Sequence, residues 1–145
     1  PPAERMPVRV VFDRRGRLGA GSRLAASAGR APVLRIAPPG APPPPPGVEA
    51  LEAGSLEQAL RLLAEREIAS LLVEGGAELA AALLRAGLVD ALALFLAPRL
   101  IGGDGRPLLG ALGVTALADA PELLATSVRA VGPDMLVEGL LHPLP

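Results

Sequence analysis

The residues best suited to chemistry are Glu74, Gly75 and Gly76, which interrupt the apolar stretch SLLVEGGAELAAALLRAG from Ser70 to Gly87. A short apolar run precedes them and an Ala- and Leu-rich helical pattern follows, as where a buried parallel strand passes into a helix. Open α/β sheets bind ligands at the carboxyl ends of their strands. Two glycines let a ligand approach the backbone, and the free N–H groups of a first helical turn suit an anion. We therefore expect an anion site here, with the charge of Glu74 at its edge.

Both features also have simpler interpretations. Glu74 could only stabilise the helix that follows it, because a carboxylate near a helix N-terminus is favourable without any ligand. Gly75 and Gly76 could be ordinary turn residues. The residues themselves leave these alternatives open.

Basic residues gather near the start of the chain, and all fourteen basic residues of the protein are arginine. The cluster suits a phosphate group, and solvated surface arginine is the alternative for most of its members. The cluster consists of Arg14, Arg15, Arg17 and Arg23.

Composition bounds the class of protein. A chain of 145 residues can bury one hydrophobic core, and a single domain spanning 1–145 is expected. A net charge of −1 argues against nucleic-acid or anionic-membrane partners. Without cysteine and with one histidine, His142, the chain has no thiolate chemistry, His-based triad or metal cluster to offer. The start, PPAERMPVR, shows no signal-peptide pattern and no initiating Met, so we expect a cytoplasmic fragment or processed chain.

Strand and helix patterns alternate along the chain and predict a layered α/β fold. Ser55 and Gln58 predict a capping box at the start of the first long helix. Gly87 ends the second, at about 77–86, whose buried face is predicted as Leu79, Ala82, Leu83 and Ala86. A proline-rich connector covers 38–47, a helical turn is expected near 23–28, and 99–121 forms a long ordered loop. Strands are predicted at 6–12, 32–37, 48–51, 68–73, 89–97, 125–131 and 135–141, the last two as an antiparallel hairpin.

Several of these segments together resemble one known family. They are PVRVVFDRRGRL, then GVEALE, then SLLVEGGAELAAALLRAGLVDALALFLAPRLIGG, and they occur in this order along nearly the whole chain. They are similar to the C-terminal reductase domain of the bifunctional riboflavin-biosynthesis deaminase/reductase. The resemblance implies a dihydrofolate-reductase-like three-layer α/β/α fold, with a mostly parallel sheet and a C-terminal antiparallel hairpin. The family's preceding strands, and the deaminase domain before them, have no counterpart in this sequence.

The resemblance also implies a reaction and a set of site residues. The reaction is NADPH-dependent reduction of 5-amino-6-(5-phosphoribosylamino)uracil to its ribitylamino form, with hydride delivered to C1′ of the opened sugar. Glu74 matches a substrate-binding glutamate, and no catalytic residue or metal ligand is assigned. The implied cofactor-binding positions are Arg14, Gly75, Gly76, Ala77, Glu78, Leu79, Ala80, Ala81 and Ala82.

Two other functions stay open at this point. One is a truncated, non-catalytic reductase domain that acts as a dimerisation or structural fragment, and the other is a reductase of the same fold for another pterin or pyrimidine substrate. The expected partners are the small-molecule substrate and, in a homodimer, a second copy of the chain.

Overall fold

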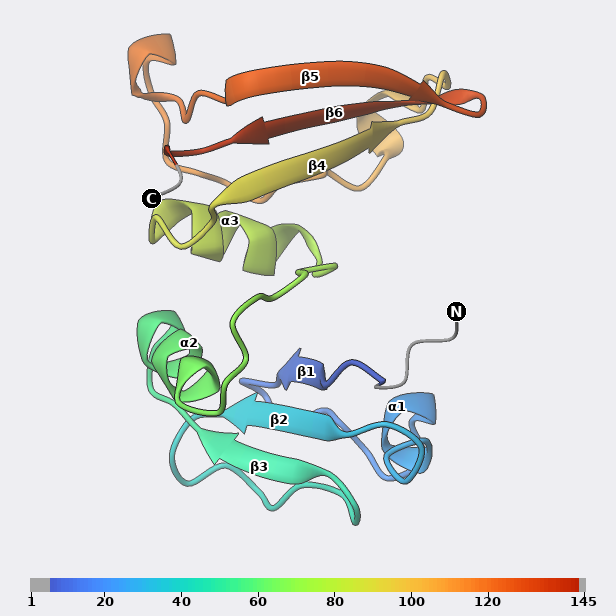
Figure 1. The fold of residues 1–145 in the computed structure, drawn as a ribbon, viewed down its shortest axis with the longest axis vertical. Coiled ribbons are helices and arrows are strands. Elements are labelled where there is room, and N and C mark those ends of the chain that lie inside the picture. Colours follow the sequence, from blue (N-terminus) through green and yellow to red (C-terminus); the bar gives the residue numbers. More distant parts are fainter. Residues whose placement is uncertain (1–5, 144–145) are drawn as a thin grey trace. The chain divides into compact units, whose positions relative to one another are not determined.

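The computed structural model describes residues 6–143 of the chain (Figure 1). It divides into two compact units, Pro1–Leu71 and Leu72–Pro145, each with its own three-stranded sheet. The first five residues, which begin the stretch without a signal-peptide pattern, lie outside the described part. Within that part, no helix has the length and apolar character needed to cross a membrane.

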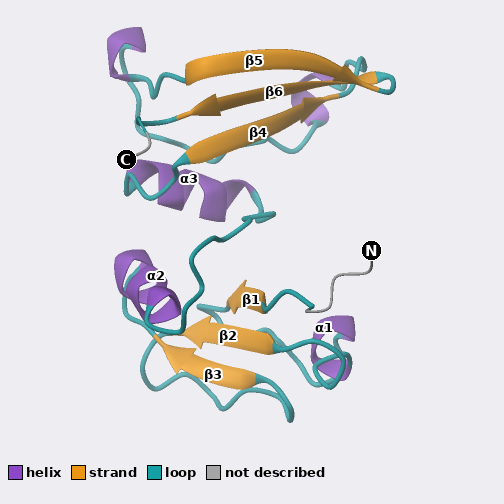
Figure 2. Ribbon diagram, viewed as in Figure 1, coloured by secondary structure: helices purple, strands orange, loops and turns teal. Residues whose placement is uncertain are grey.

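The first unit is built on a parallel sheet in the order β1-β2-β3. Its strands are β1 (Arg9–Phe12), β2 (Val33–Ala37) and β3 (Glu49–Glu52), which confirms three of the predicted strands. The central strand β2 is buried at every position, whereas the edge strand β3 is mostly exposed. The expected helical turn forms as α1 (Arg23–Ala26), capped by Ser22. The proline-rich connector joins β2 to β3 (Figure 2).

Helix α2 (Leu56–Ala64) begins with the predicted cap. The hydroxyl of Ser55 accepts a hydrogen bond from the Gln58 N–H at 3.2 Å. The Gln58 side chain accepts from the Gly54 N–H at 2.8 Å, one residue before the position that the capping box predicts. Leu63, which is 2% exposed, anchors α2 in a core shared with β2.

The predicted strand at 68–73 is wrong, because this segment forms no ladder with any described strand. Ile68 and Leu71 pack against the core of the first unit, whereas Leu72 is 84% exposed. An apolar run reports which residues prefer burial, but a strand also needs hydrogen-bonding partners on a neighbouring segment. In this segment some apolar side chains are packed against the core, but the backbone has no neighbouring strand among the described residues to bond with.

The second unit has an antiparallel sheet in the order β4-β6-β5, as Figure 2 shows. The strands are β4 (Ala91–Leu96), β5 (Leu124–Val131) and β6 (Asp134–Leu140). The predicted closing hairpin is confirmed, with Gly132 at φ +60° in its turn. β4 pairs antiparallel with β6, so the described strands divide equally between a parallel and an antiparallel sheet.

Helix α3 (Ala77–Arg85) begins at the N-cap Gly76, and Gly87 follows its end at φ +65°, as predicted. The predicted buried face is only partly right. Leu83 is 2% exposed, but Ala86 is exposed because it is the C-cap residue, where the chain leaves the helix. Ala81, which the prediction omitted, is fully buried at 0% exposure.

The long loop between β4 and β5 is ordered by two short 3-10 turns, η1 (Gly102–Asp104) and η2 (Leu117–Asp119). It also bonds to α3 at two points. The Gly110 N–H donates to the Ala77 carbonyl at 3.0 Å, and the Arg85 guanidinium donates to the Ala111 carbonyl. The loop therefore lies along the helix that starts at the glycine turn.

Candidate functional site

The start of α3 leaves three backbone donors free. The Gly76 carbonyl accepts from the N–H groups of Leu79 and Ala80, both at 3.1 Å. No acceptor among the described residues bonds to the N–H of Gly76, Ala77 or Glu78, and the N-cap supplies no side chain. Free donors at the positive end of a helix dipole form a site suited to an anion.

The two glycines of the turn differ in whether the surrounding structure requires a glycine at that position. A Cβ atom at Gly75 would lie 2.8 Å from Leu79 Cδ2, so glycine there lets Leu79 pack against the turn. A Cβ at Gly76 would meet no heavy atom within 4 Å. The φ of −74° at Gly76 suits any residue as well. Neither packing nor backbone conformation requires glycine at position 76, where open space adjoins the free donors.

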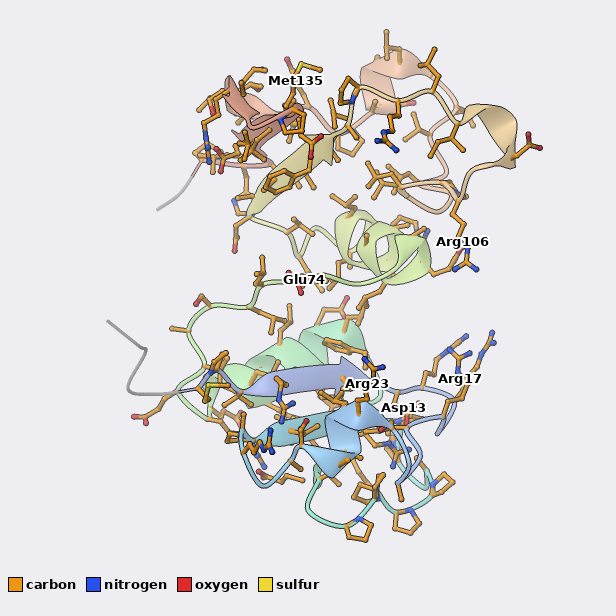
Figure 3. The ribbon with its side chains drawn as sticks, turned by 90° about the vertical axis from the view of Figure 1, so that its right-hand side faces the viewer. Asp13, Arg17, Arg23, Glu74, Arg106 and Met135 are labelled. Carbon is orange, nitrogen blue, oxygen red and sulfur yellow. The ribbon has the colours of Figure 1, made fainter. Side chains whose placement is uncertain are left out.

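Glu74 lies on the extended segment before α3 (Figure 3), and it is exposed. None of the hydrogen bonds and ion pairs found among residues 6–143 involves its carboxylate. The interpretation of Glu74 as a direct cap of the helix is therefore not supported by a contact. Its carboxylate is available to a ligand beside the glycine turn.

The long loop contributes a close approach that the sequence pattern did not predict. A Cβ at Gly110 would lie 3.0 Å from Glu78 Oε1 and 3.3 Å from the Ala77 carbonyl oxygen. Only glycine allows the loop backbone to reach the first turn of α3 without displacing one of these groups. The signal in the sequence was a glycine inside the apolar run LLGALG, which on its own does not identify its neighbour.

Arg14, the other predicted cofactor residue, is exposed on the loop after β1 in the first unit. The loop is held by Asp13, which directly follows the strand predicted at 6–12 and is 6% exposed. Its Oδ1 accepts from the Arg17 N–H at 2.7 Å, and its Oδ2 accepts from the Leu18 N–H at 3.0 Å and from Arg35 Nε at 2.8 Å. Burial raises the pKa of Asp13, but these hydrogen bonds outweigh it and lower the pKa below its ordinary value.

The predicted positions thus fall in two places. Residues 74–82 form one continuous run at the start of α3, and Arg14 belongs to the loop of the first unit. Within the run, the fully buried Ala81 directs its side chain into the core, so the accessible part is the glycine turn and the first helical residues. Their roles as ligand contacts stay predictions.

A hollow of about 140 Å³ lies elsewhere in the second unit and contains none of the predicted site residues. Beside it, His142 Nε2 lies 3.1 Å from Asp90 Oδ1, and the Asp90 carbonyl accepts from the Leu141 N–H at 2.9 Å. Asp90 therefore bonds to the end of the chain near His142 through both its side chain and its backbone.

The solved structures that this fold matches are reductase domains of the dihydrofolate-reductase-like class, so the chain has an α/β fold of that class. The chain belongs to the RibD C-terminal domain family, whose model matches residues 1–137. Among the solved structures that share the fold are two riboflavin-biosynthesis proteins. RibD from Acinetobacter baumannii superposes with a TM-score of 0.78 at 26% identity, covering 91% of this chain and 37% of that one. A deaminase/5-amino-6-(5-phosphoribosylamino)uracil reductase from Thermotoga maritima gives 0.75 at 30% identity, covering 92% and 37%.

Sequence relatives agree with this family. The riboflavin biosynthesis protein RibD of Escherichia coli is 48% identical over 73 residues, which cover 50% of this chain and 20% of that protein. The 2,5-diamino-6-ribosylamino-4(3H)-pyrimidinone 5′-phosphate reductase of Methanothermobacter thermautotrophicus is 34% identical over 142 residues, covering 91% of this chain and 65% of that enzyme. The matched part amounts to about a fifth of the length of the RibD proteins.

Proposed function

We propose that this chain is part of an NADPH-dependent reductase of riboflavin biosynthesis that converts 5-amino-6-(5-phosphoribosylamino)uracil to its ribitylamino form. Membership of the RibD C-terminal domain family supports the reaction class, and the Thermotoga maritima protein is named for this reduction. The observation that assigns cofactor binding to a place in the chain is the surroundings of Gly76. This glycine leaves open space beside three N–H groups that have no acceptor among the described residues.

The start of α3 would hold a phosphate of the dinucleotide. Phosphate oxygens would accept hydrogen bonds from the N–H groups of Gly76, Ala77 and Glu78, and the helix dipole would favour their charge. NADPH, when bound, supplies the hydride. The chain's residues bind and orient, because in cofactor enzymes the protein mainly holds the reacting carbons in line.

Glu74 would hold the substrate. An exposed carboxylate accepts hydrogen bonds only, so it suits a hydroxyl of the opened sugar or an N–H of the pyrimidine. Charge-assisted hydrogen bonds of this kind are stronger than neutral ones and would fix the substrate's orientation. No residue of the chain is assigned as a catalytic proton donor.

The reaction can be tested by mixing the 145-residue chain with NADPH and 5-amino-6-(5-phosphoribosylamino)uracil and following the loss of NADPH absorbance. We expect oxidation that Gly76→Val abolishes and that a control, Gly29→Ala, retains. Gly29 is a matched control because a Cβ there also meets nothing within 4 Å, and it lies far from α3 in the sequence. NADPH binding without oxidation would favour the non-catalytic alternative for this chain, and no binding would contradict the proposal.

One observation favours a second substrate. The Methanothermobacter relative, which aligns with most of this chain, is named for reducing 2,5-diamino-6-ribosylamino-4(3H)-pyrimidinone 5′-phosphate. That pyrimidine carries an amino group where the uracil carries a carbonyl, so one donates and the other accepts a hydrogen bond. Comparing kcat/KM for the two compounds would decide between them, since a site built for one polarity strongly rejects the other.

We also propose a homodimer in the cytoplasm, and that both units belong to one reductase domain, because the family model spans both. Apolar side chains on one face of the antiparallel sheet support self-association: Leu96 is 39% exposed, Val128 is 64% exposed and Met135 is 47% exposed. Exposed apolar groups gathered on one element commonly mark an interaction surface. Sedimentation equilibrium would test it, and a monomer at all accessible concentrations would contradict it.

A further inference from the structure

The loop after β1 is tied down by an ion pair buried in the first unit. Asp13 is 6% exposed and Arg35 on β2 is 3% exposed, and their side chains meet at 2.8 Å. A buried ion pair is seldom more stabilising than apolar residues of the same volume, because both charges lose their hydration. We therefore look for the role of this ion pair in the local backbone geometry that it fixes, and not in its contribution to stability.

That geometry is the path of residues 14–18. Besides Arg35, the carboxylate of Asp13 accepts from the backbone N–H groups of Arg17 and Leu18, and the Asp13 carbonyl accepts from the Gly16 N–H at 3.2 Å. Gly16 sits at φ +63°, a conformation that favours glycine. The loop backbone is held at three successive positions.

Arg35 also holds the proline-rich connector, which lies beside this loop. One terminal nitrogen of its guanidinium donates to the Pro42 carbonyl at 2.5 Å, which holds the proline-rich connector in place. The other nitrogen is buried, has no partner among the described residues, and lies 3.5 Å from where a Cβ of Gly16 would be. The charge of Asp13 is thus balanced inside the fold by Arg35.

The loop presents three guanidinium groups that form no ion pair with any described residue. They belong to Arg14, Arg15 and Arg17, which are all exposed. Figure 3 shows Asp13 against the ribbon of the first unit and Arg17 extending away from it. Guanidinium groups on a fixed backbone suit a phosphate, because less freedom is lost when it binds.

We infer that Asp13, paired with Arg35, is a positioning residue for the dinucleotide: it fixes residues 14–18 so that the exposed arginines of this loop meet a phosphate of NADPH. This inference rests on the proposed function, and on the prediction from the family resemblance that Arg14 contacts the cofactor. It adds two buried residues that touch no ligand themselves and act through the loop. The hydrogen bonds and the Arg35 guanidinium that lower the pKa of Asp13 agree with a charged carboxylate at neutral pH.

The test uses two ways of removing the pair in the full 145-residue chain. Asp13→Asn keeps the size of the side chain but removes its charge, and it leaves Arg35 unpaired. The double variant Asp13→Leu, Arg35→Met removes both charges together, so it leaves no unpaired buried charge and is expected to stay folded. Glu49→Gln is the control, because it breaks the exposed ion pair with Arg66 in the same unit.

NADPH affinity is measured by calorimetry at several salt concentrations, and the thermal midpoint is measured alongside it. We expect the double variant to bind NADPH at least about tenfold more weakly, which corresponds to ~1.4 kcal/mol. We also expect its affinity to depend less on salt, because the arginines no longer face the phosphate together. A merely structural role would lower the thermal midpoint and leave the salt dependence of binding unchanged.

The outcomes separate this inference from the function it rests on. If wild type and the Glu49→Gln control bind NADPH and the folded double variant binds equally well with the same salt dependence, only the positioning role is overturned. If the wild-type chain does not bind NADPH, the proposed function of this chain fails and the positioning role fails with it.

Discussion

Replacing Gly76 by serine should change stability and cofactor binding in opposite directions. Gly76 is the N-cap of α3 and supplies no side-chain hydrogen bond to the helix. Serine is a better N-cap than glycine by a few tenths of a kcal/mol, because its hydroxyl accepts from a free N–H of the first turn. Since a Cβ at this position meets nothing within 4 Å and φ is −74°, the new side chain causes no clash. We expect a gain of roughly 0.3 kcal/mol in the free energy of unfolding.

The same hydroxyl should weaken the binding of NADPH. It would occupy the space beside the N–H groups of Gly76, Ala77 and Glu78 and compete for one of them. A hydrogen bond to a charged group contributes about 1.5–3 kcal/mol, so losing one would weaken binding by about ten- to a hundredfold. Glycine at position 76 would then serve ligand binding, at the cost of the small stability that a serine cap would add to α3.

Urea denaturation measures the first effect and calorimetric titration with NADPH measures the second. Gly29→Ser serves as the control, because that glycine also has open space around it and belongs to no predicted site. If Gly76→Ser bound NADPH as tightly as the wild-type chain, a phosphate would not sit on this turn and the reasoning from open space would be refuted.

Three further predictions concern the first unit. Leu63→Ala should lower the free energy of unfolding by ~2–5 kcal/mol in urea denaturation, because Leu63 is 2% exposed in the core, and a loss below ~1 kcal/mol would show that the core is not packed as described. Ser55→Ala should cost about 1 kcal/mol through the lost cap of α2, seen as a lower urea midpoint with an unchanged slope, whereas no shift would mean the cap is not formed in solution. Because the pKa of Asp13 is lower in the folded chain than its ordinary value of 3.8, its contribution to stability is full above that value and is lost as pH falls through the folded pKa. Acid titration of the unfolding midpoint should therefore be less steep below about pH 4 for Asp13→Asn than for wild type, and equal slopes would contradict the lowered pKa.

Local patterns predicted much of the fold. The Ser55 cap, the helix-ending Gly87 and the closing hairpin are signals within a few residues of each other, and all appear in the structure, although the Gln58 side chain bonds to Gly54 and not to Ser55. Strands β1 and β2 of the parallel sheet were also found, because β-branched apolar runs between turn residues have few other interpretations.

Contacts distant in sequence could not be predicted in this way. Asp13 and Arg35 are 22 residues apart, and no local pattern pairs them. The same holds for Gly110 on Ala77, and for the antiparallel pairing of β4 with β6. The segment at 68–73 had the apolar character of a strand, but whether a neighbouring strand lies beside it is decided by the rest of the chain. For the site, the turn was visible in the sequence, whereas the open space at Gly76 and the free N–H groups needed the structure.

The central claim is that the first turn of α3 receives a phosphate of NADPH, and amide chemical shifts of the isotope-labelled chain test it most directly. On titration with NADPH, the largest changes should fall on the backbone N–H groups of Gly76, Ala77 and Glu78, whose donors are free in the structure. NADH and inorganic phosphate, titrated separately, would show which part of the cofactor causes them. Saturable binding that leaves these three amides unmoved, or no binding at all, would contradict the claim.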